Sequence, residues 1–217
     1  MEKSKPRIII SAAISIDGRI ATRTGDSHLS SREDLARLHG LRARVDAILV
    51  GVNTVLRDDP MLNVRKVRGK NPTRIILDSA GRIPQNSKIM RTCNGIPTIV
   101  VVSQKITRYN LARLQKSPAD IIITGKNKPS IKVLLKRLGD KKIKSVLVEG
   151  GGRVIWEFVR TGLFDEIFVT VSPVLLGGDS VPLVSGRGPA RISDWPVLRL
   201  KSAKRLKNHL VLRYAKD

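Results

Sequence analysis

Residues 47–65 read AILVGVNTVLRDDPMLNVR, and this stretch joins a buried strand to a segment rich in polar functional groups. The run Ala47–Gly51 is apolar throughout, which is typical of a strand covered on both faces of a sheet. After it we predict a polar turn that carries hydroxyl, carboxylate and guanidinium groups around Pro60. In an open parallel sheet, polar groups at the end of a strand mark a ligand site. The stretch therefore predicts a parallel sheet with a binding site at the end of this strand.

Outward from this stretch, apolar strands alternate with helical patterns. The predicted strands are Arg7–Ile16, Ala47–Gly51, Arg74–Asp78, Thr98–Val102, Ile121–Thr124 and Ser145–Glu149, and the predicted helices are Arg32–Arg44, Tyr109–Gln115, Ser130–Leu138 and Val154–Arg160. After Glu166 the helical patterns stop, and Glu166–Val174, Val197–Leu206 and His209–Tyr214 are predicted to be antiparallel additions to the same sheet. The pattern indicates an α/β fold with a mixed, mostly parallel twisted sheet flanked by helices.

Length and composition restrict the class of protein. A chain of 217 residues favours a single domain over residues 1–217, with residues 1–6 as a flexible N-terminus. The single cysteine, Cys93, excludes a disulfide framework and a multi-cysteine zinc site, and with only three histidines we expect no metal centre. No apolar run is long enough for a membrane span, and no signal peptide is visible, so we expect a cytoplasmic protein without membrane partners.

The net charge of +23 is the outlier in the composition. A nucleic-acid-binding protein would show such a balance, but here the basic residues are spread along the whole chain. Aromatic residues, which would stack on bases, make up only 3 % of the sequence. We therefore expect specific nucleic-acid binding to be absent, and we interpret the charge as a solvated basic surface or an attraction for a polyanionic small ligand.

Two further segments carry chemical signals. The segment 145–156, SVLVEGGGRVIW, predicts a strand that ends at Glu149, a glycine turn, and a helix whose first N–H groups could face a pyrophosphate. A glycine triplet also suits a simple tight turn, and its spacing is not that of the dinucleotide-binding fingerprint. The segment Ser15–Ala21, SIDGRIA, contains Asp17-Gly18, which taken alone could be an ordinary turn.

Together these segments resemble the reductases of riboflavin biosynthesis, a family that includes free-standing archaeal and fungal enzymes and the C-terminal half of bacterial deaminase-reductases. The residues that carry the resemblance are Ser15-x-Asp17-Gly18-x-x-Ala21, Thr54-Val55-x-x-Asp58-Asp59-Pro60-x-Leu62-x-x-Arg65, Leu77-Asp78-Ser79, Glu149-Gly150-Gly151-Gly152 and Pro173-x-x-x-Gly177-Gly178. They occur in the family's order over nearly the whole chain. The resemblance implies a fold similar to dihydrofolate reductase.

The resemblance also implies an activity and a cofactor. NADPH, or alternatively NADH, would transfer hydride to C1′ of a phosphorylated ribosylamino-pyrimidine and open its ribose to a ribityl chain. The step is similar to the reduction of an imine, in which the cofactor carries the chemistry and the protein supplies geometry and charge. A homodimer is implied as well, and the apolar C-terminal strands offer a contact surface for it.

By the family pattern, each matching residue receives an expected role. Cofactor contacts fall on Thr54, Asp58, Ser79, Arg82, Gly150, Gly151, Gly152 and Arg153; substrate contacts fall on Ser27, Arg42, Leu62, Arg65 and Glu149. Two arginines can clamp a dianionic phosphate, and Glu149 can accept hydrogen bonds from an amino-pyrimidine. Asp58 and Glu149 are the candidates for the catalytic acid. Without the resemblance, Arg42 could be a solvent-facing helix residue and Leu62 ordinary core.

The subgroup affects the expected substrate. Bacterial members carry a Lys where this chain has Ser11, so the chain resembles the free-standing archaeal type. In that branch reduction precedes deamination, which points to 2,5-diamino-6-(5-phosphoribosylamino)pyrimidin-4(3H)-one. The alternatives are the deaminated 5-amino-6-(5-phosphoribosylamino)uracil, a pterin-like substrate of a dihydrofolate-reductase-like enzyme, and a basic nucleic-acid-binding protein without catalysis. A substrate without phosphate would leave the two arginines without a role.

Overall fold

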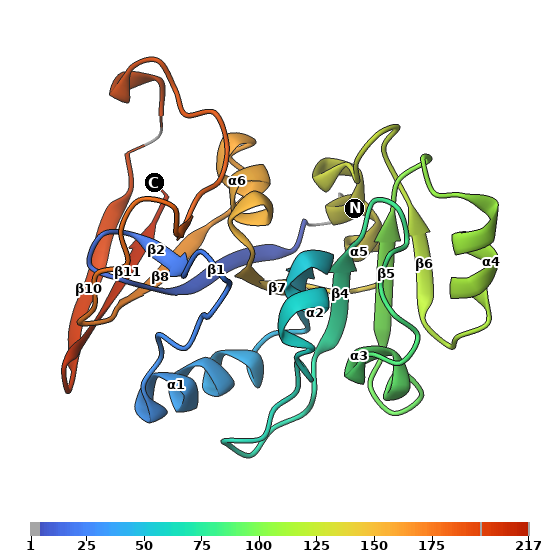
Figure 1. The fold of residues 1–217 in the computed structure, drawn as a ribbon, viewed down its shortest axis with the longest axis horizontal. Helices are drawn as coiled ribbons and strands as arrows, with labels where there is room; N and C mark the ends of the chain where they lie inside the picture. The colour runs from blue at the N-terminus through green and yellow to red at the C-terminus, as the bar shows by residue number, and fades with distance from the viewer. Residues whose placement is uncertain (1–4, 196, 217) are drawn as a thin grey trace. The chain divides into compact units, whose positions relative to one another are not determined.

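The computed structural model describes residues 5–195 and 197–216. The chain forms two compact units, both assembled from separate stretches of sequence (Figure 1). Of the described residues, the first unit contains 5–7 and His39–Leu147, and the second contains Ile8–Leu38 and the part from Val148 onward. The expectation of a flexible N-terminus over residues 1–6 falls mostly outside the described residues.

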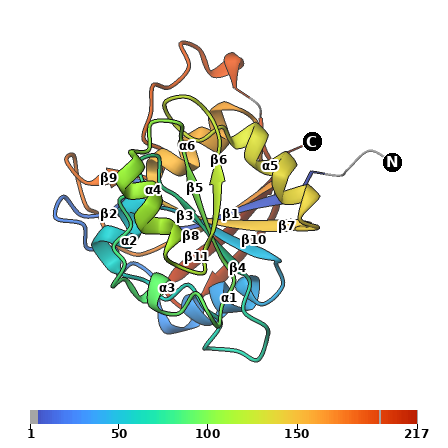
Figure 2. The ribbon, with the colours of Figure 1, turned by 90° about the vertical axis from the view of Figure 1, so that its right-hand side faces the viewer.

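The first unit is built on four parallel strands. They are β3 (Ala47–Gly51), β4 (Thr73–Leu77), β5 (Thr98–Val102) and β6 (Asp120–Ile123), in the spatial order in which they occur in the sequence. All five residues of β3 and of β5 are buried, as continuous apolar strands with both faces covered require. Figure 2 shows β5, β6 and helix α4 (Arg108–Gln115) on the side that faces the viewer.

Three helices of the first unit begin at side-chain caps. The hydroxyls of Ser87, Thr107 and Ser130 accept main-chain N–H groups at the starts of α3 (Lys88–Arg91), α4 and α5 (Ile131–Asp140). In α5 the buried residues Ile131, Leu134, Leu135 and Leu138 follow the spacing of one helix face. Helix α1 (Arg32–Arg42) and strand β7 (Ser145–Gly150) each contribute residues to both units.

The predicted polar turn after Gly51 is wrong, because the chain enters helix α2 (Val52–Asp58) there. Val52 and Val55, three positions apart, are both buried and belong to the same apolar cluster as the neighbouring strands. Their burial holds a short helix that no side-chain cap supports. The helix ends at Asp58, and the C-cap residue Asp59, directly before Pro60, has a left-handed backbone with φ of 37°.

The second unit contains four neighbouring strands of the main sheet, in the spatial order β10-β11-β8-β1. These strands are β1 (Arg7–Ile14), β8 (Glu166–Val171), β10 (Arg199–Leu206) and β11 (His209–Ala215). Strand β11 is antiparallel to β8 and to β10, as predicted. The prediction for Glu166–Val174 is wrong in direction, because β8 pairs in parallel with β1, and the strand ends at Val171.

Smaller elements complete the second unit. Helix α6 (Gly152–Arg160) buries Val154, Ile155 and Phe158. A short ribbon pairs β2 (Arg19–Ala21) with β9 (Val181–Pro182), and a 3-10 turn covers Ile192–Asp194. Strands β2 and β9 and helix α3 were not predicted, because all three are shorter than the segments that periodicity detects. Among the described residues, no helix combines the length and the apolar character that crossing a membrane requires.

Candidate functional site

The loop between α2 and β4 brings two of the predicted substrate residues together in the first unit. Arg42, at the end of α1, donates from Nη1 to the main-chain carbonyl of Asn63 at 3.0 Å. Arg65 donates from Nη1 to the side-chain oxygen of the same Asn63, also at 3.0 Å. The Arg42 residue is only 7 % exposed, so it is not a solvent-facing helix residue. The two guanidinium groups therefore meet around one residue of the loop.

A buried histidine, which the sequence analysis passed over, lies in the same cluster. His39 is on α1, three positions before Arg42, and its Nδ1 accepts the main-chain N–H of Arg65 at 3.1 Å. Burial, together with the smaller effect of the charges of Arg42, Arg65 and Lys66, lowers the pKa of His39 to about 4. The ring is therefore neutral at physiological pH, which its acceptor role requires.

Leu62 lies next to this cluster but belongs to the apolar core. It is 2 % exposed and has a left-handed backbone with φ of 47°. The carbonyl before it, that of Met61, accepts a hydrogen bond from Nη1 of Arg74 at 3.3 Å. Arg74 is fully buried, and burial lowers its pKa to about 10. The structure thus gives Leu62 a core role, and it identifies Arg74 as a support of the loop.

A second group of predicted residues, Thr54, Asp58 and Arg82, lies on α2 or is tied to it. Nη2 of Arg82 donates to the side-chain oxygen of Asn53 at 2.7 Å, so the loop after β4 is tied to the residue preceding Thr54. Asp58, at the other end of the helix, accepts from Nε of Arg57 at 2.9 Å. Arg82 and Asp58 are both exposed. These residues form a polar rim around α2 within the first unit.

The loop after β4 is shaped by the buried carboxylate of Asp78. Its Oδ2 accepts the main-chain N–H of Ile83 at 2.7 Å. The carbonyl of Ser79 accepts both the N–H and the hydroxyl of Ser103, at 3.1 and 2.8 Å. These hydrogen bonds fix the main chain of Ser79. Ser79 itself is partly exposed, and Arg82, in the same loop, is exposed.

The glycine turn in the second unit has a backbone that other residues adopt only under strain. Gly150 has φ of 136° and Gly151 has φ of 35°, and α6 begins at Gly152. A Cβ at Gly150 would meet nothing within 4 Å, whereas one at Gly152 would lie 2.5 Å from Oγ of Ser185. The turn therefore leaves open space at Gly150 and packs closely at Gly152. Glu149 is partly buried directly before it, and Arg153 is exposed directly after it.

The remaining predicted residue, Ser27, lies in the exposed loop between β2 and α1, where its carbonyl accepts the N–H of Leu29 at 2.8 Å. 

The turn at Asp17 has a structural role that goes beyond an ordinary turn. Its carboxylate accepts the hydroxyl of Ser15 at 2.6 Å and the main-chain N–H groups of Leu176 and Gly177 at 3.1 and 2.8 Å. The hydroxyl of Ser15 and these N–H groups lower the pKa of Asp17 to about 2. The turn thus holds the loop that carries Pro173 to Gly178.

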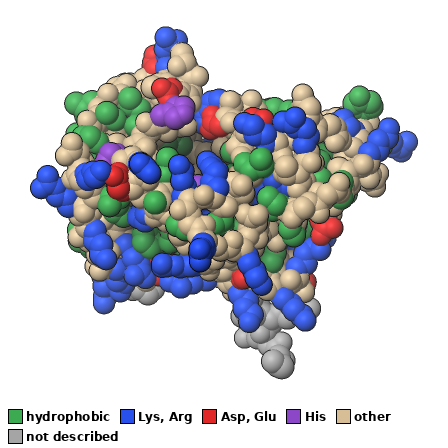
Figure 3. Space-filling model, turned by 90° about the horizontal axis from the view of Figure 1, so that it is seen from below, with side chains coloured by type: hydrophobic (Ala, Val, Ile, Leu, Met, Phe, Trp, Pro, Cys, Tyr) green, Lys and Arg blue, Asp and Glu red, His purple; other side chains and the backbone are tan. Residues whose placement is uncertain are grey.

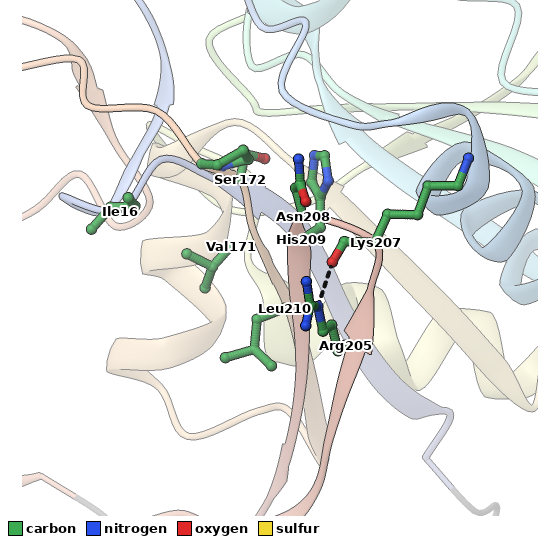
Figure 4. Close-up of a pocket in the computed structure, with 9 residues that line it drawn as sticks. Ile16, Val171, Ser172, Arg205, Lys207, Asn208, His209 and Leu210 are labelled. Atoms are coloured by element: carbon green, nitrogen blue, oxygen red, sulfur yellow. Dashed lines mark hydrogen bonds between the residues drawn. The ribbon is translucent and has the colours of Figure 1, made fainter.

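The second unit also contains a cavity of about 530 Å³ near the ends of β8 and β11 (Figure 4). Its lining is partly apolar and partly basic, and one hydrogen bond within it joins Nε of Arg205 to the carbonyl of Lys207 at 2.9 Å. The cavity is lined by Ile16, Val171, Ser172, Pro173, Arg205, Lys207, Asn208, His209 and Leu210. None of the predicted site residues lines it, so it is not the site that the sequence predicts.

On the face that Figure 3 shows, basic side chains do not gather in a single block. Figure 3 shows Lys and Arg side chains spread over much of the face seen from below, with hydrophobic and uncharged groups between them. A nucleic-acid groove would concentrate such charge and add aromatic side chains. This distribution agrees with the interpretation of the charge as a solvated basic surface.

Comparison with known proteins gives the context for these residues. The family model described as RibD C-terminal domain matches residues 6–212. The chain is 37 % identical over 214 residues to a protein of Methanothermobacter thermautotrophicus named 2,5-diamino-6-ribosylamino-4(3H)-pyrimidinone 5′-phosphate reductase, covering 97 % of this chain and 98 % of that relative. A protein of the same name from Aquifex aeolicus is 37 % identical over 204 residues, with 91 % of each chain covered.

Solved structures show the same fold. RibD of Acinetobacter baumannii superposes with a TM-score of 0.84 at 27 % identity, and the match covers 98 % of this chain but 58 % of that one. The chain therefore spans little more than half the length of that RibD. Dihydrofolate reductase of Enterococcus faecalis, 13 % identical, matches with a TM-score of 0.53 over 97 % of this chain and 96 % of that one. The predicted dihydrofolate-reductase-like fold is confirmed, and the chain belongs to the RibD C-terminal domain family.

Proposed function

We propose that the protein is a reductase of riboflavin biosynthesis that converts 2,5-diamino-6-(5-phosphoribosylamino)pyrimidin-4(3H)-one to its ribitylamino form. The observation that carries this proposal is the pair of guanidinium groups, Arg42 and Arg65, bound to the same Asn63. Paired arginines suit a dianionic phosphate, because each can offer two donors in one plane. The relative from Methanothermobacter thermautotrophicus, whose name states a 5′-phosphate substrate, supports the choice.

We propose NADPH as the cofactor, with NADH as the weaker alternative, and the residues present fit such a dinucleotide. The positive φ values of Gly150 and Gly151, the open space at Gly150 and the start of α6 suit a pyrophosphate beside main-chain N–H groups. The exposed guanidinium groups of Arg82 and Arg153 suit the 2′-phosphate. When bound, the cofactor supplies the hydride. Thr54, Asp58, Ser79 and Gly152 are the further residues that we assign to it.

The chain's own residues orient the substrate in this proposal. Arg42 and Arg65 bind its phosphate and thereby use binding energy far from the reacting carbon to fix the ribose. Glu149 accepts hydrogen bonds from the amino groups of the pyrimidine, Ser27 completes the substrate side, and Leu62 supports that side from the apolar core. Asp58 and Glu149 remain the two candidates for the proton that imine reduction requires, and the carboxylate of Asp58 is already bonded to Arg57.

We further propose that the chain is one cytoplasmic reductase domain that acts as a homodimer. The family model, which extends from residue 6 to 212 across both units, supports the single domain. Leu200 on β10 and Leu210 on β11 are 51 % and 41 % exposed, and such apolar side chains on the C-terminal strands support a contact between copies. Sedimentation at micromolar concentration tests this point, and a purely monomeric protein would exclude it.

Turnover of purified protein tests the function. We expect oxidation of NADPH with the diaminopyrimidinone substrate, and mass spectrometry of the product should show two added hydrogens and a ribityl chain. Higher kcat/KM for the deaminated uracil substrate would reverse the choice of substrate. Turnover of a pterin would favour the dihydrofolate-reductase-like alternative, and no turnover of any of the three would refute the proposed function.

A further inference from the structure

The loop from Asp59 to Pro72 must hold its shape without regular secondary structure. It carries Asn63 and Arg65, and it contains two non-glycine residues with positive φ, Asp59 and Leu62. Such backbones persist only where surrounding contacts hold them. The positions of the loop's functional groups therefore depend on the side chains that bind its main chain.

Four side chains of the first unit bind the main chain of this loop, and one of them, Asn71, belongs to the loop itself. Arg42 and Arg74 donate to the carbonyls of Asn63 and Met61, and Oδ1 of Asn71 accepts the N–H of Val64 at 2.8 Å. The fourth is His39, which accepts the N–H of Arg65 itself. Among the four, only the His39 contact fixes the main chain of the residue whose guanidinium group we assign to the phosphate.

The chemistry of His39 suits this fixed acceptor role. Because Nδ1 accepts a main-chain N–H, the ring is neutral and carries its proton on Nε2. The residue is 1 % exposed, and the charged groups that act on it are Arg42 on its own helix and Arg65 and Lys66 on the loop, all cations. A protonated ring would repel these cations and lose the acceptor. The surroundings therefore keep the ring in the form that holds Arg65.

We propose that His39 is a positioning residue for phosphate recognition: its Nδ1 fixes the main chain of Arg65 so that the Arg65 and Arg42 guanidinium groups bind one phosphate. The proposal rests on the proposed function, in which these arginines bind the substrate phosphate. His39 itself does not touch the substrate in this role. It sets the distance between two cations that would otherwise move apart by mutual repulsion.

Three substitutions separate this role from a purely structural one. In His39→Asn the amide oxygen lies as many bonds from Cα as Nδ1 does, so it can accept the same N–H. In His39→Gln the oxygen lies one bond further out, and in His39→Leu the acceptor is absent. Arg68→Ala, an exposed residue of the same loop, is the matched control.

The readout is the preference for phosphorylated over dephosphorylated substrate, measured as the ratio of the two kcat/KM values. We expect His39→Leu to raise KM for the phosphorylated substrate about tenfold at nearly unchanged kcat and to lower the preference by a similar factor. His39→Gln should behave similarly, and His39→Asn and Arg68→Ala should stay within about twofold of the unmodified protein. If His39→Leu does not fold, the comparison of His39→Gln with His39→Asn carries the test.

The outcomes distinguish this inference from the proposed function. An unchanged preference in His39→Leu and His39→Gln, or an equal loss in His39→Asn, would overturn the positioning role. If Arg42→Ala and Arg65→Ala lose the preference in that case, the proposed function survives. If these arginine variants keep the full preference, the assignment of the phosphate site itself fails.

Discussion

Replacing Arg74 by Met should destabilise the first unit strongly, because its guanidinium group joins segments that are separate in the sequence. Nη1 donates to the hydroxyl of Thr92 at 2.8 Å and to the carbonyl of Met61, and Nη2 donates to the carbonyls of Ile89 and Ile96 at 2.9 and 3.1 Å. The hydroxyl of Thr98 accepts from Nε at 3.0 Å and from Nη2 at 2.8 Å. These partners are all neutral oxygens, so the guanidinium group acts as a hydrogen-bond donor to several segments at once.

The magnitude follows from two opposing effects. Met removes the cost of a dehydrated cation, a cost that is visible in the lowered pKa of Arg74. Against this, several charged hydrogen bonds are lost, each worth about 1.5–3 kcal/mol, and the carbonyl of Met61 is left without its donor. Because such contributions are not additive and the substitution leaves several neutral acceptors without a donor, we expect a loss of about 3–5 kcal/mol in the free energy of unfolding.

Urea unfolding measures this loss as a change in midpoint at constant slope. Arg74→Lys should also be destabilising, since an ammonium group cannot reach partners that lie on both sides of a planar fork. Arg91→Met, which removes an exposed arginine from helix α3, is the control and should change stability by less than about 0.5 kcal/mol. Should Arg74→Met unfold at the same urea concentration as the unmodified protein, relief of the buried charge would outweigh the lost donors, and the reasoning would be refuted.

Three further predictions concern other residues. Because the pKa of His39 lies below the unfolded value of 6.5, its contribution to stability is present above about pH 6.5 and is lost as the pH falls toward 4. After allowance for solvent screening, this contribution to the free energy of unfolding amounts to about 1–2 kcal/mol. Urea titrations of His39→Asn across this range should lack this pH-dependent loss of stability. Asp17, whose pKa is lowered to about 2, stabilises the second unit at pH values above the unfolded carboxylate pKa. The unmodified protein should therefore lose stability between about pH 4 and 2, and Asp17→Asn should abolish this loss. An unchanged acid profile in the variant would contradict a stabilising role of the hydrogen bond from the Gly177 N–H to Asp17. Arg82→Ala and Arg153→Ala should lower the NADPH/NADH ratio of kcat/KM, and the assignment to the 2′-phosphate fails if both variants keep the original ratio.

Sequence patterns predicted the central strands well because burial on both faces leaves a continuous apolar run. Ala47–Gly51 and Thr98–Val102 begin and end in the structure where the pattern placed them. Helix α2 was missed because it is short, has no side-chain cap and is held by the burial of two valines. The direction of β8 could not be predicted, since it depends on pairing with a strand far away in the sequence.

The candidate site was predicted only in part for a similar reason. Motif residues such as Arg65 could be named from their chemistry and from the family resemblance. The residues that hold them could not, because His39 and Arg74 act through main-chain groups of a loop that has no periodic pattern. One signal was present in the sequence: Arg74 stands within an otherwise apolar strand, where a charged residue requires buried partners.

The discontinuous composition of the second unit affects how the chain can fold during synthesis. Strand β1 leaves the ribosome early, but its parallel partner β8 follows only after the whole first unit, and the bond from the Ile8 N–H to Asp165 spans 157 positions. Closing so long a loop is slow, whereas His39–Leu147 is continuous and can fold as soon as it emerges. The apolar β1 must therefore wait unpaired while the middle of the chain folds, which makes it the segment most in need of chaperone protection in the nascent protein.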